Sequence, residues 1–180
     1  MSEYPPATSI GAAIKQNRPF SGVEHQVYLA LQRAAADLTQ QAAVLLRPFG
    51  LSGAQYNILR ILRGAGAEGL ACGEIAERLL TRDPDMTRLL DRMQRQGLVT
   101  RERASHDRRV VTTRITAQGR HVLSQLDEPM AGMHRRQLAH MDAARLRDLA
   151  TLLDAVVAGP HPEPPEPPEP RGSPTLAQPA

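Results

Sequence analysis

Residues 84–96 and the two short runs that follow them limit the fold of this chain more than any other feature. Apolar side chains recur in the first segment at spacings of three and four, which places them on one face of a helix. These side chains belong to Met86, Leu89, Leu90 and Met93. Gly97 provides a helix stop, and residues 98–103 and 110–115 alternate as strands around a polar loop. The pattern therefore predicts an amphipathic helix followed at once by a β-hairpin.

The same region holds most of the positive charge of the chain. Residues 78–120 contain eleven arginines against five acids, although the whole chain has a net charge of only +3. A helix suits the major groove of a DNA duplex, and a basic hairpin tip can reach the neighbouring minor groove. A GC-rich genome would also favour arginine, since 21 of the 22 basic residues are Arg. Position as well as number of the arginines makes double-stranded DNA the leading partner.

Helical periodicity dominates the rest of the chain. Before the basic region, we expect a short helix near residues 9–16 and a long helix over residues 23–46. A third helix is capped by Ser52 and broken at residues 64–66. A strand at Leu70–Ala71 and a short helix over residues 73–80 follow, and this helix is expected to bury Ile75, Leu79 and Leu80. We expect Asp83 to cap the basic helix, with Pro84 as its first residue, and strands to follow over residues 98–103 and 110–115. A long helix then runs from Thr116 to about Ala139 and bends near Pro129. The last helix starts at Asp142, and its apolar side chains are Leu146, Leu149, Leu152, Leu153 and Val156.

This order predicts a mainly α protein with a winged helix-turn-helix, α-α-α-α-β-β-α-α plus a short strand before the third helix. The first and last helices are longer than so small a winged domain needs. We therefore expect a second copy of the chain to cover the apolar face of each. The expected domains are a flexible arm over residues 1–21, the main domain over residues 22–158, and a disordered Pro/Glu tail over residues 159–180. Within the main domain, residues 22–47 and 117–158 form the dimerisation helices and residues 52–116 the winged helix-turn-helix.

An ordered series of short segments resembles the MarR family of bacterial transcriptional regulators. The series consists of Gly50-Leu51-Ser52, Gln55-Tyr56-Asn57-Ile58-Leu59, Ile75-Ala76-Glu77-Arg78-Leu79, Thr87-Arg88-Leu89-Leu90-Asp91-Arg92-Met93, Gly97-Leu98-Val99, Asp107-Arg108-Arg109 and Thr116-Ala117-Gln118-Gly119-Arg120. No single segment is decisive, but their order and spacing are specific, and together they cover about residues 22–157. The resemblance implies a homodimer that binds a pseudo-palindromic operator. It also implies repression of a nearby gene or of its own, relieved by a small ligand or an oxidant.

The predicted DNA contacts fall into two groups. On the basic helix and just before it, the expected residues are Arg82, Asp85, Thr87, Arg88 and Arg92. In the wing they are Arg101, Arg103, Asp107, Arg108 and Arg109, with Asp107 orienting Arg109 toward a minor groove. We expect Asp91 to orient an arginine, because phosphate repels a carboxylate. The alternative for both groups is a solvated surface with internal ion pairs, such as Arg88 with Asp91.

Other sites are less well defined by the sequence. The resemblance implies a pocket for a small phenolic or aromatic ligand between the dimerisation helices and the winged domain, and the residues that could line it are His25, Tyr28, Tyr56, Met130, Met133 and His134. Residues of these types in such positions more often belong to a core or an interface than to a pocket. Cys72, the only cysteine, lies near a helix start, a position that permits a redox switch, but we expect an ordinary small, half-buried residue there. Peroxide-sensing members of the family carry their reactive cysteine in the first helix, which has none here.

An enzyme is not expected, because the chain has no Gly-rich phosphate loop, no Gly-x-Ser-x-Gly elbow and no clustered His and carboxylate residues. We expect no cofactor, no metal and no membrane span, and hence a cytoplasmic protein. An architectural DNA-binding protein with little sequence preference is the main alternative. The acids Asp83, Asp85 and Asp91 argue against it, since a non-specific binder gains nothing by repelling phosphate. A regulator without any inducing ligand is a further alternative.

Overall fold

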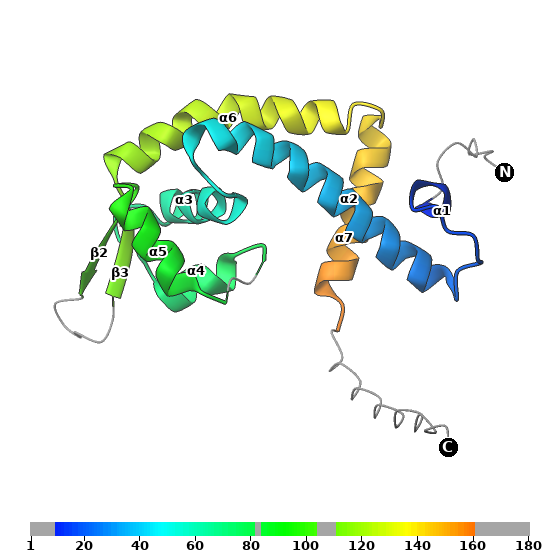
Figure 1. Ribbon diagram of the computed structural model, residues 1–180, viewed down its shortest axis with the longest axis horizontal. Helices are drawn as coiled ribbons and strands as arrows, with labels where there is room; N and C mark the ends of the chain where they lie inside the picture. The colour runs from blue at the N-terminus through cyan, green and yellow to red at the C-terminus, as the bar shows by residue number, and fades with distance from the viewer. Residues whose placement is uncertain (1–9, 82–83, 104–110, 161–180) are drawn as a thin grey trace, which may run out of the picture. The chain divides into compact units, whose positions relative to one another are not determined.

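The computed structural model describes residues 10–81, 84–103 and 111–160, and its elements follow the predicted order (Figure 1). The helices are α1 (Ile10–Ala13), α2 (Val23–Leu46), the 3-10 helix η1 (Arg47–Phe49), α3 (Gly53–Ala65), α4 (Cys72–Arg78), α5 (Met86–Arg95), α6 (Ala117–Gln137) and α7 (Ala143–Ala158), and the strands are β1 (Leu70–Ala71), β2 (Val99–Arg103) and β3 (Val111–Ile115). A mainly helical winged helix-turn-helix is thus confirmed. The described residues fall into two compact units, which divide between Ala139 and His140, and the second unit contains α7.

Local signals set the ends of α2 and α3. The chain leaves α2 through η1, where Gly50 takes a left-handed conformation with φ of 64°. At the start of α3, the Ser52 hydroxyl accepts a hydrogen bond from the Gln55 amide at 3.2 Å, and the Gln55 side chain accepts one from the Ser52 amide at 2.9 Å. This capping box satisfies two amides that the first helical turn would otherwise leave without partners. Both ends lie where the sequence predicts them.

A three-stranded antiparallel sheet closes the winged unit. Its strand order is β1-β3-β2, with Leu70 opposite Thr113 and Arg101 also opposite Thr113 on the other side of the central strand. Gly69 precedes β1 with φ of 69°, and a Cβ there would lie 2.4 Å from the Thr113 carbonyl oxygen. Only glycine therefore allows β1 to approach β3 this closely.

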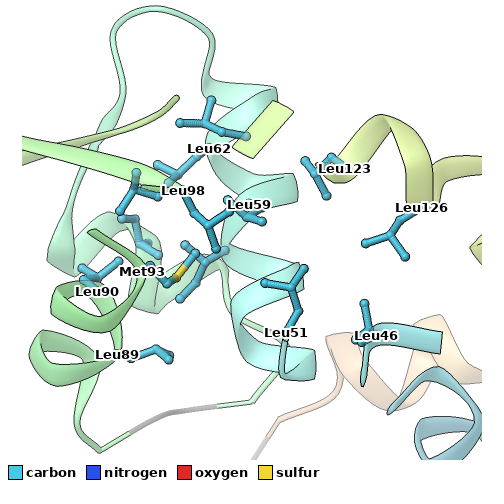
Figure 2. Packing of buried hydrophobic residues seen from close by; sticks show 14 of the residues in the cluster. Leu46, Leu51, Leu59, Leu62, Leu89, Leu90, Met93, Leu98, Leu123 and Leu126 are labelled. Atoms are coloured by element: carbon cyan, nitrogen blue, oxygen red, sulfur yellow. The ribbon is translucent and has the colours of Figure 1, made fainter. Parts of the chain in front are cut away.

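The core lies between α3, α5 and the sheet on one side and the ends of α2 and α6 on the other. Figure 2 shows Leu59, Met93 and Leu98 pointing toward one another, with Leu46, Leu123 and Leu126 beside them at the α2–α6 side. The buried residues are mainly aliphatic and methionine, as a chain without tryptophan requires. This core fixes one face of α5 and leaves the other toward solvent.

The structure corrects the predicted start of the basic helix. The sequence indicated Asp83 as its cap and Pro84 as its first residue, but α5 begins at Met86 and Asp85 is its N-cap. The Asp85 carboxylate accepts a hydrogen bond from the Arg88 amide at 3.3 Å. Asp83 itself lies outside the described residues. The helix is therefore two residues shorter at its start than the sequence predicted.

A second correction concerns Leu80, which was predicted to be buried at the end of the short helix. Helix α4 already ends at Arg78, and Leu79 is extended with ψ of 141°. The Leu80 side chain is 85% exposed, while Ile75 is buried and Leu79 half-buried. The helix ends two residues before Leu80, so the helical spacing that would have turned this side chain inward does not reach it.

Helices α6 and α7 begin as predicted. The Thr116 hydroxyl accepts a hydrogen bond from the Gly119 amide at 3.0 Å and caps α6, which then passes through Pro129 as one helix to Gln137. In the second unit, the Asp142 carboxylate accepts a hydrogen bond from the Arg145 amide at 2.9 Å and caps α7. No residue of α7 is buried within the single chain.

Candidate nucleic-acid interface

Helix α5 has one buried and one exposed face. Met86, Leu89, Leu90 and Met93 are at most 8% exposed, whereas Thr87, Arg88, Arg92 and Arg95 are exposed. At its end, the Leu98 amide donates to the Met93 carbonyl at 3.0 Å and the Gly97 amide donates to the Gln94 carbonyl at 2.9 Å. With Gly97 at φ of 69°, this is a Schellman motif, which ends the helix sharply before β2. The predicted reading face is thus solvent-exposed on a helix that is fixed at both ends.

The ion pairs on this exposed face differ from the Arg88–Asp91 pair of the alternative interpretation. Arg88 forms an ion pair with the cap Asp85 at 3.3 Å, and its side chain remains 85% exposed. Asp91 pairs instead with Arg101 of β2. Arg92 forms no ion pair with any residue that the structure describes. An exposed guanidinium of this kind can donate two hydrogen bonds to a guanine edge or to a phosphate.

In the wing, the structure separates two arginines that the sequence treated alike. Arg103 at the end of β2 is exposed, whereas the Arg101 side chain is only 18% exposed and faces Asp91. The neighbouring Arg114 of β3 donates to the Ala67 carbonyl at 2.9 Å and to Glu102 at 3.2 Å, so it braces the base of the wing. The other predicted contacts, Arg82, Asp107, Arg108 and Arg109, lie outside the described residues.

A polar network that the sequence analysis missed connects α3, α5 and α6. Gln55 is only 3% exposed, and its side-chain amide donates to the Gln96 side-chain oxygen at 2.9 Å. The Thr116 hydroxyl donates to the Gly97 carbonyl at 2.7 Å. The capping-box spacing of Ser52 and Gln55 was visible in the sequence, but the contact with Gln96 joins residues 41 positions apart and has no local signal. This network holds the C-terminal end of α5 in place.

The six residues proposed for a ligand pocket lie in different environments. Met130 and Met133 belong to the core, at 5% and 3% exposure. Tyr56 is half-buried, with the Arg60 guanidinium 5.9 Å from its ring centre. The other three, His25, Tyr28 and His134, are exposed. A shallow, open depression occurs elsewhere, on α5, where Asp91, Gln94 and Arg95 line it.

An ion pair beside these residues joins α3 to α6. The Arg63 guanidinium donates two hydrogen bonds to the Asp127 carboxylate, at 2.8 and 2.9 Å. These bonds lower the pKa of Asp127, an effect that partial burial opposes, and they raise the pKa of Arg63. The bidentate geometry fixes the direction of both side chains and so connects the winged helix-turn-helix to helix α6.

Three further observations concern the cysteine, possible metal ligands and possible membrane spans. Cys72 is half-buried at the start of the seven-residue α4. No three His, Cys, Asp or Glu side chains among the described residues are grouped as metal ligands would be. None of the described helices has the length and apolar character needed to cross a membrane.

Comparison with known proteins places these observations in one family. The MarR family model matches residues 49–110, which run from η1 into the wing. A MarR transcription factor from Planctomyces limnophilus is 39% identical, with 76% of this chain and 98% of that chain covered and a TM-score of 0.59. The organic hydroperoxide resistance transcriptional regulator of Bacillus subtilis is 31% identical over 97 residues, 54% of this chain and 65% of its own length.

A DNA complex is among the similar structures. The transcriptional repressor CouR, solved with a 23-mer DNA duplex, is 25% identical, with 80% of this chain and 100% of that chain covered and a TM-score of 0.66. The likeness to the Planctomyces factor extends over nearly all of that protein and agrees with the fold and the order of the motifs. The chain belongs to the MarR family of transcription regulators.

Proposed function

We propose that this protein is a homodimeric repressor that binds a pseudo-palindromic operator near its own or a neighbouring operon. The observation that carries the proposal is the two-faced character of α5. Its apolar face is buried in the core, and its opposite face presents Arg88 and Arg92 to solvent within the segment that the family model matches. A helix anchored in this way can enter a major groove without changing its own packing.

Specific reading is favoured over general DNA binding by the charges around these arginines. Asp85 lies within 3.3 Å of Arg88 and thereby restricts the direction of its guanidinium. A protein that recognised only phosphates would gain affinity from the loss of this acid. We therefore assign Arg88 and Arg92 to base edges, and Thr87 to a phosphate or a thymine methyl group. CouR, a relative solved with a 23-mer DNA duplex, supports DNA binding by analogy.

Relief of repression by a small ligand is the second part of the proposal. The Arg63–Asp127 contact joins the winged unit to α6, and the aromatic Tyr56 and the cation Arg60 lie close to Arg63 on α3. A phenolic or aromatic molecule that displaced this contact would change how α3 is held against α6. Such a molecule would bind with different affinity to the DNA-competent and incompetent arrangements, as a population shift requires.

The test of the DNA-binding role uses Arg92→Ala. Loss of one arginine that contacts a base is expected to cost about 1–3 kcal/mol of operator affinity and to relax the preference at one base pair. The operator is the duplex upstream of the gene that the wild-type protein protects in footprinting, and binding is measured at one fixed salt concentration. Arg18→Ala is the matched control, because it removes the same charge from an exposed position between α1 and α2.

Two outcomes would contradict the proposal. If Arg92→Ala and Arg18→Ala bind the operator equally well, the exposed face of α5 does not read it. If wild-type protein binds a scrambled duplex of the same length and composition as tightly as the protected one, the protein is an architectural binder instead.

A further inference from the structure

We propose that Arg101 is a positioning residue for operator reading, which acts by fixing recognition helix α5 to strand β2 through Asp91. This inference rests on the proposed function and replaces the sequence-based prediction that Arg101 contacts DNA. It gives Asp91, an acid on a DNA-binding helix, a definite task.

The geometry directs Arg101 away from solvent. One terminal nitrogen of its guanidinium, Nη1, donates to Oδ1 of Asp91. The Arg101 side chain is 18% exposed, and its Nε is buried with no hydrogen-bond partner among the described residues. Arg103, two residues further along the same strand, is exposed. A guanidinium held in this way is poorly placed to follow a phosphate backbone.

Electrostatics gives the pair its importance for DNA binding. Helix α5 carries Arg88, Arg92 and Arg95, and Asp91 is its only acid between Met86 and Arg95. Without Arg101 the Asp91 carboxylate would repel phosphate, and without Asp91 the largely buried Arg101 would lack its charge partner. Arg101 therefore neutralises the repulsion between Asp91 and phosphate, and Asp91 stabilises the charge of Arg101.

The two partners belong to different DNA-reading elements, each of which is anchored independently. Strand β2 is held in the sheet, where Arg101 lies opposite the fully buried Thr113. Helix α5 is anchored by its buried apolar face. The ion pair spans the space between them and fixes the rotation of the helix relative to the wing. Loss of the pair should therefore cost operator specificity more than general affinity for DNA.

Asp91→Asn tests the inference through the direction in which its affinity for DNA changes. If charge alone mattered, removal of this acid would tighten binding to every duplex. The positioning role predicts that affinity for the footprinted operator falls about tenfold while affinity for the scrambled duplex stays equal or rises. The double variant Asp91→Asn/Arg101→Gln has the same net charge as the wild type and should lose no more specificity than Asp91→Asn does.

Arg103→Gln is the matched control on the same strand. As an exposed phosphate neighbour, Arg103 should contribute about 0.9 to the slope of log affinity against log salt, and its loss should weaken both duplexes together. The Asp91→Asn/Arg101→Gln variant should keep the wild-type slope. Arg101→Lys, which preserves a charge opposite Asp91, should retain part of the specificity.

Three results would overturn the inference. The first is tighter operator binding by Asp91→Asn. The second is a loss of specificity in the double variant that equals the sum of the losses in Asp91→Asn and Arg101→Gln. The third is a salt slope of the double variant that is smaller than that of the wild type, as expected for Arg103→Gln. Thermal unfolding of each variant ensures that binding is compared between folded proteins. If the wild type itself does not distinguish the two duplexes, the proposed function has failed rather than this inference.

Discussion

Gly119 lies where the first turn of α6 passes directly over the backbone that enters the wing. A Cβ at this position would be 2.4 Å from the Leu98 carbonyl oxygen and 2.8 Å from the Ile115 side chain, and the first of these is backbone that cannot move aside. We predict that Gly119→Ala lowers the free energy of unfolding by about 2–3 kcal/mol through overpacking. Denaturant unfolding, monitored by circular dichroism, measures the change.

Gly64→Ala is the control for this prediction. Gly64 lies inside α3, and nothing lies within 4 Å of the Cβ that alanine would add. Alanine there should leave stability unchanged or raise it by up to about 1 kcal/mol, because it favours helix over unfolded chain. Equal stability of the two variants would show that α6 can shift away from the wing at little cost.

Single residues were predictable where their role is local. Ser52 and Thr116 cap helices, and Gly97 ends one, through bonds to residues within a few positions of them. Asp83 and Asp85 were harder to distinguish, because either one can cap a helix that starts beside Pro84. The role of Arg101 was missed, since its partner Asp91 is ten residues away on another element and only the packing of α5 on β2 brings them together.

At the scale of elements, we expect the contact between α3 and α6 to depend on pH. The hydrogen bonds from Arg63 lower the pKa of Asp127 below its usual 3.8, so the carboxylate stabilises the fold above that value. The contribution is lost as the pH falls through the lower pKa of the folded state. Because the two side chains are 39% and 49% exposed, we predict that Asp127→Asn costs less than about 1 kcal/mol at neutral pH.

The difference between wild type and Asp127→Asn should close as the pH is lowered below about 4, when the wild-type carboxyl also becomes protonated. Urea unfolding at a series of pH values measures it. Asp37→Asn is the control, because it breaks an exposed ion pair with Arg33 inside α2 alone and should matter less. A difference that stayed constant down to pH 2 would mean that Asp127 acts through packing rather than charge.

Elements were predictable where the sequence period persisted, and not where it stopped. Helix α2 and strand β1 have the predicted limits because an unbroken stripe and flanking glycines define them. Helix α4 did not bury Leu80, because nothing in a seven-residue helix marks its last turn. The ligand pocket is a still larger-scale feature, and periodicity alone cannot tell a core methionine such as Met133 from a residue that lines a cavity.

At the scale of the whole molecule, the long helices outside the winged helix-turn-helix carry many exposed apolar side chains. Among the 24 residues of α2 only Leu46 is buried, while Val23, Val27 and Tyr28 are exposed. In α7 no residue is buried, and Leu152, Leu153, Val156 and Val157 are between 38% and 76% exposed. Apolar faces of this length rarely remain in water, and a second copy of the chain offers the same faces in return.

We therefore predict that Leu152→Glu/Val156→Glu dissociates the dimer. Charges on the apolar side of α7 would have to be buried in the interface, which is far more costly than leaving them in water. Sedimentation at several protein concentrations should show monomer, with the helical content retained. Operator affinity should then fall steeply, since each half-site would be bound independently and the two recognition helices would no longer be linked.

Thr151→Glu is the matched control on the same helix. At about 100° per residue, Thr151 lies about 100° from Leu152 and about 140° from Val156 around the axis of α7. It is exposed, with its hydroxyl donating to the Arg147 carbonyl at 3.0 Å. A dimer that survives Thr151→Glu but not the double variant would assign the interface to the apolar side. A double variant that remained dimeric and bound the operator would show instead that α2 and the remaining helices suffice, and the apolar face of α7 would need another explanation.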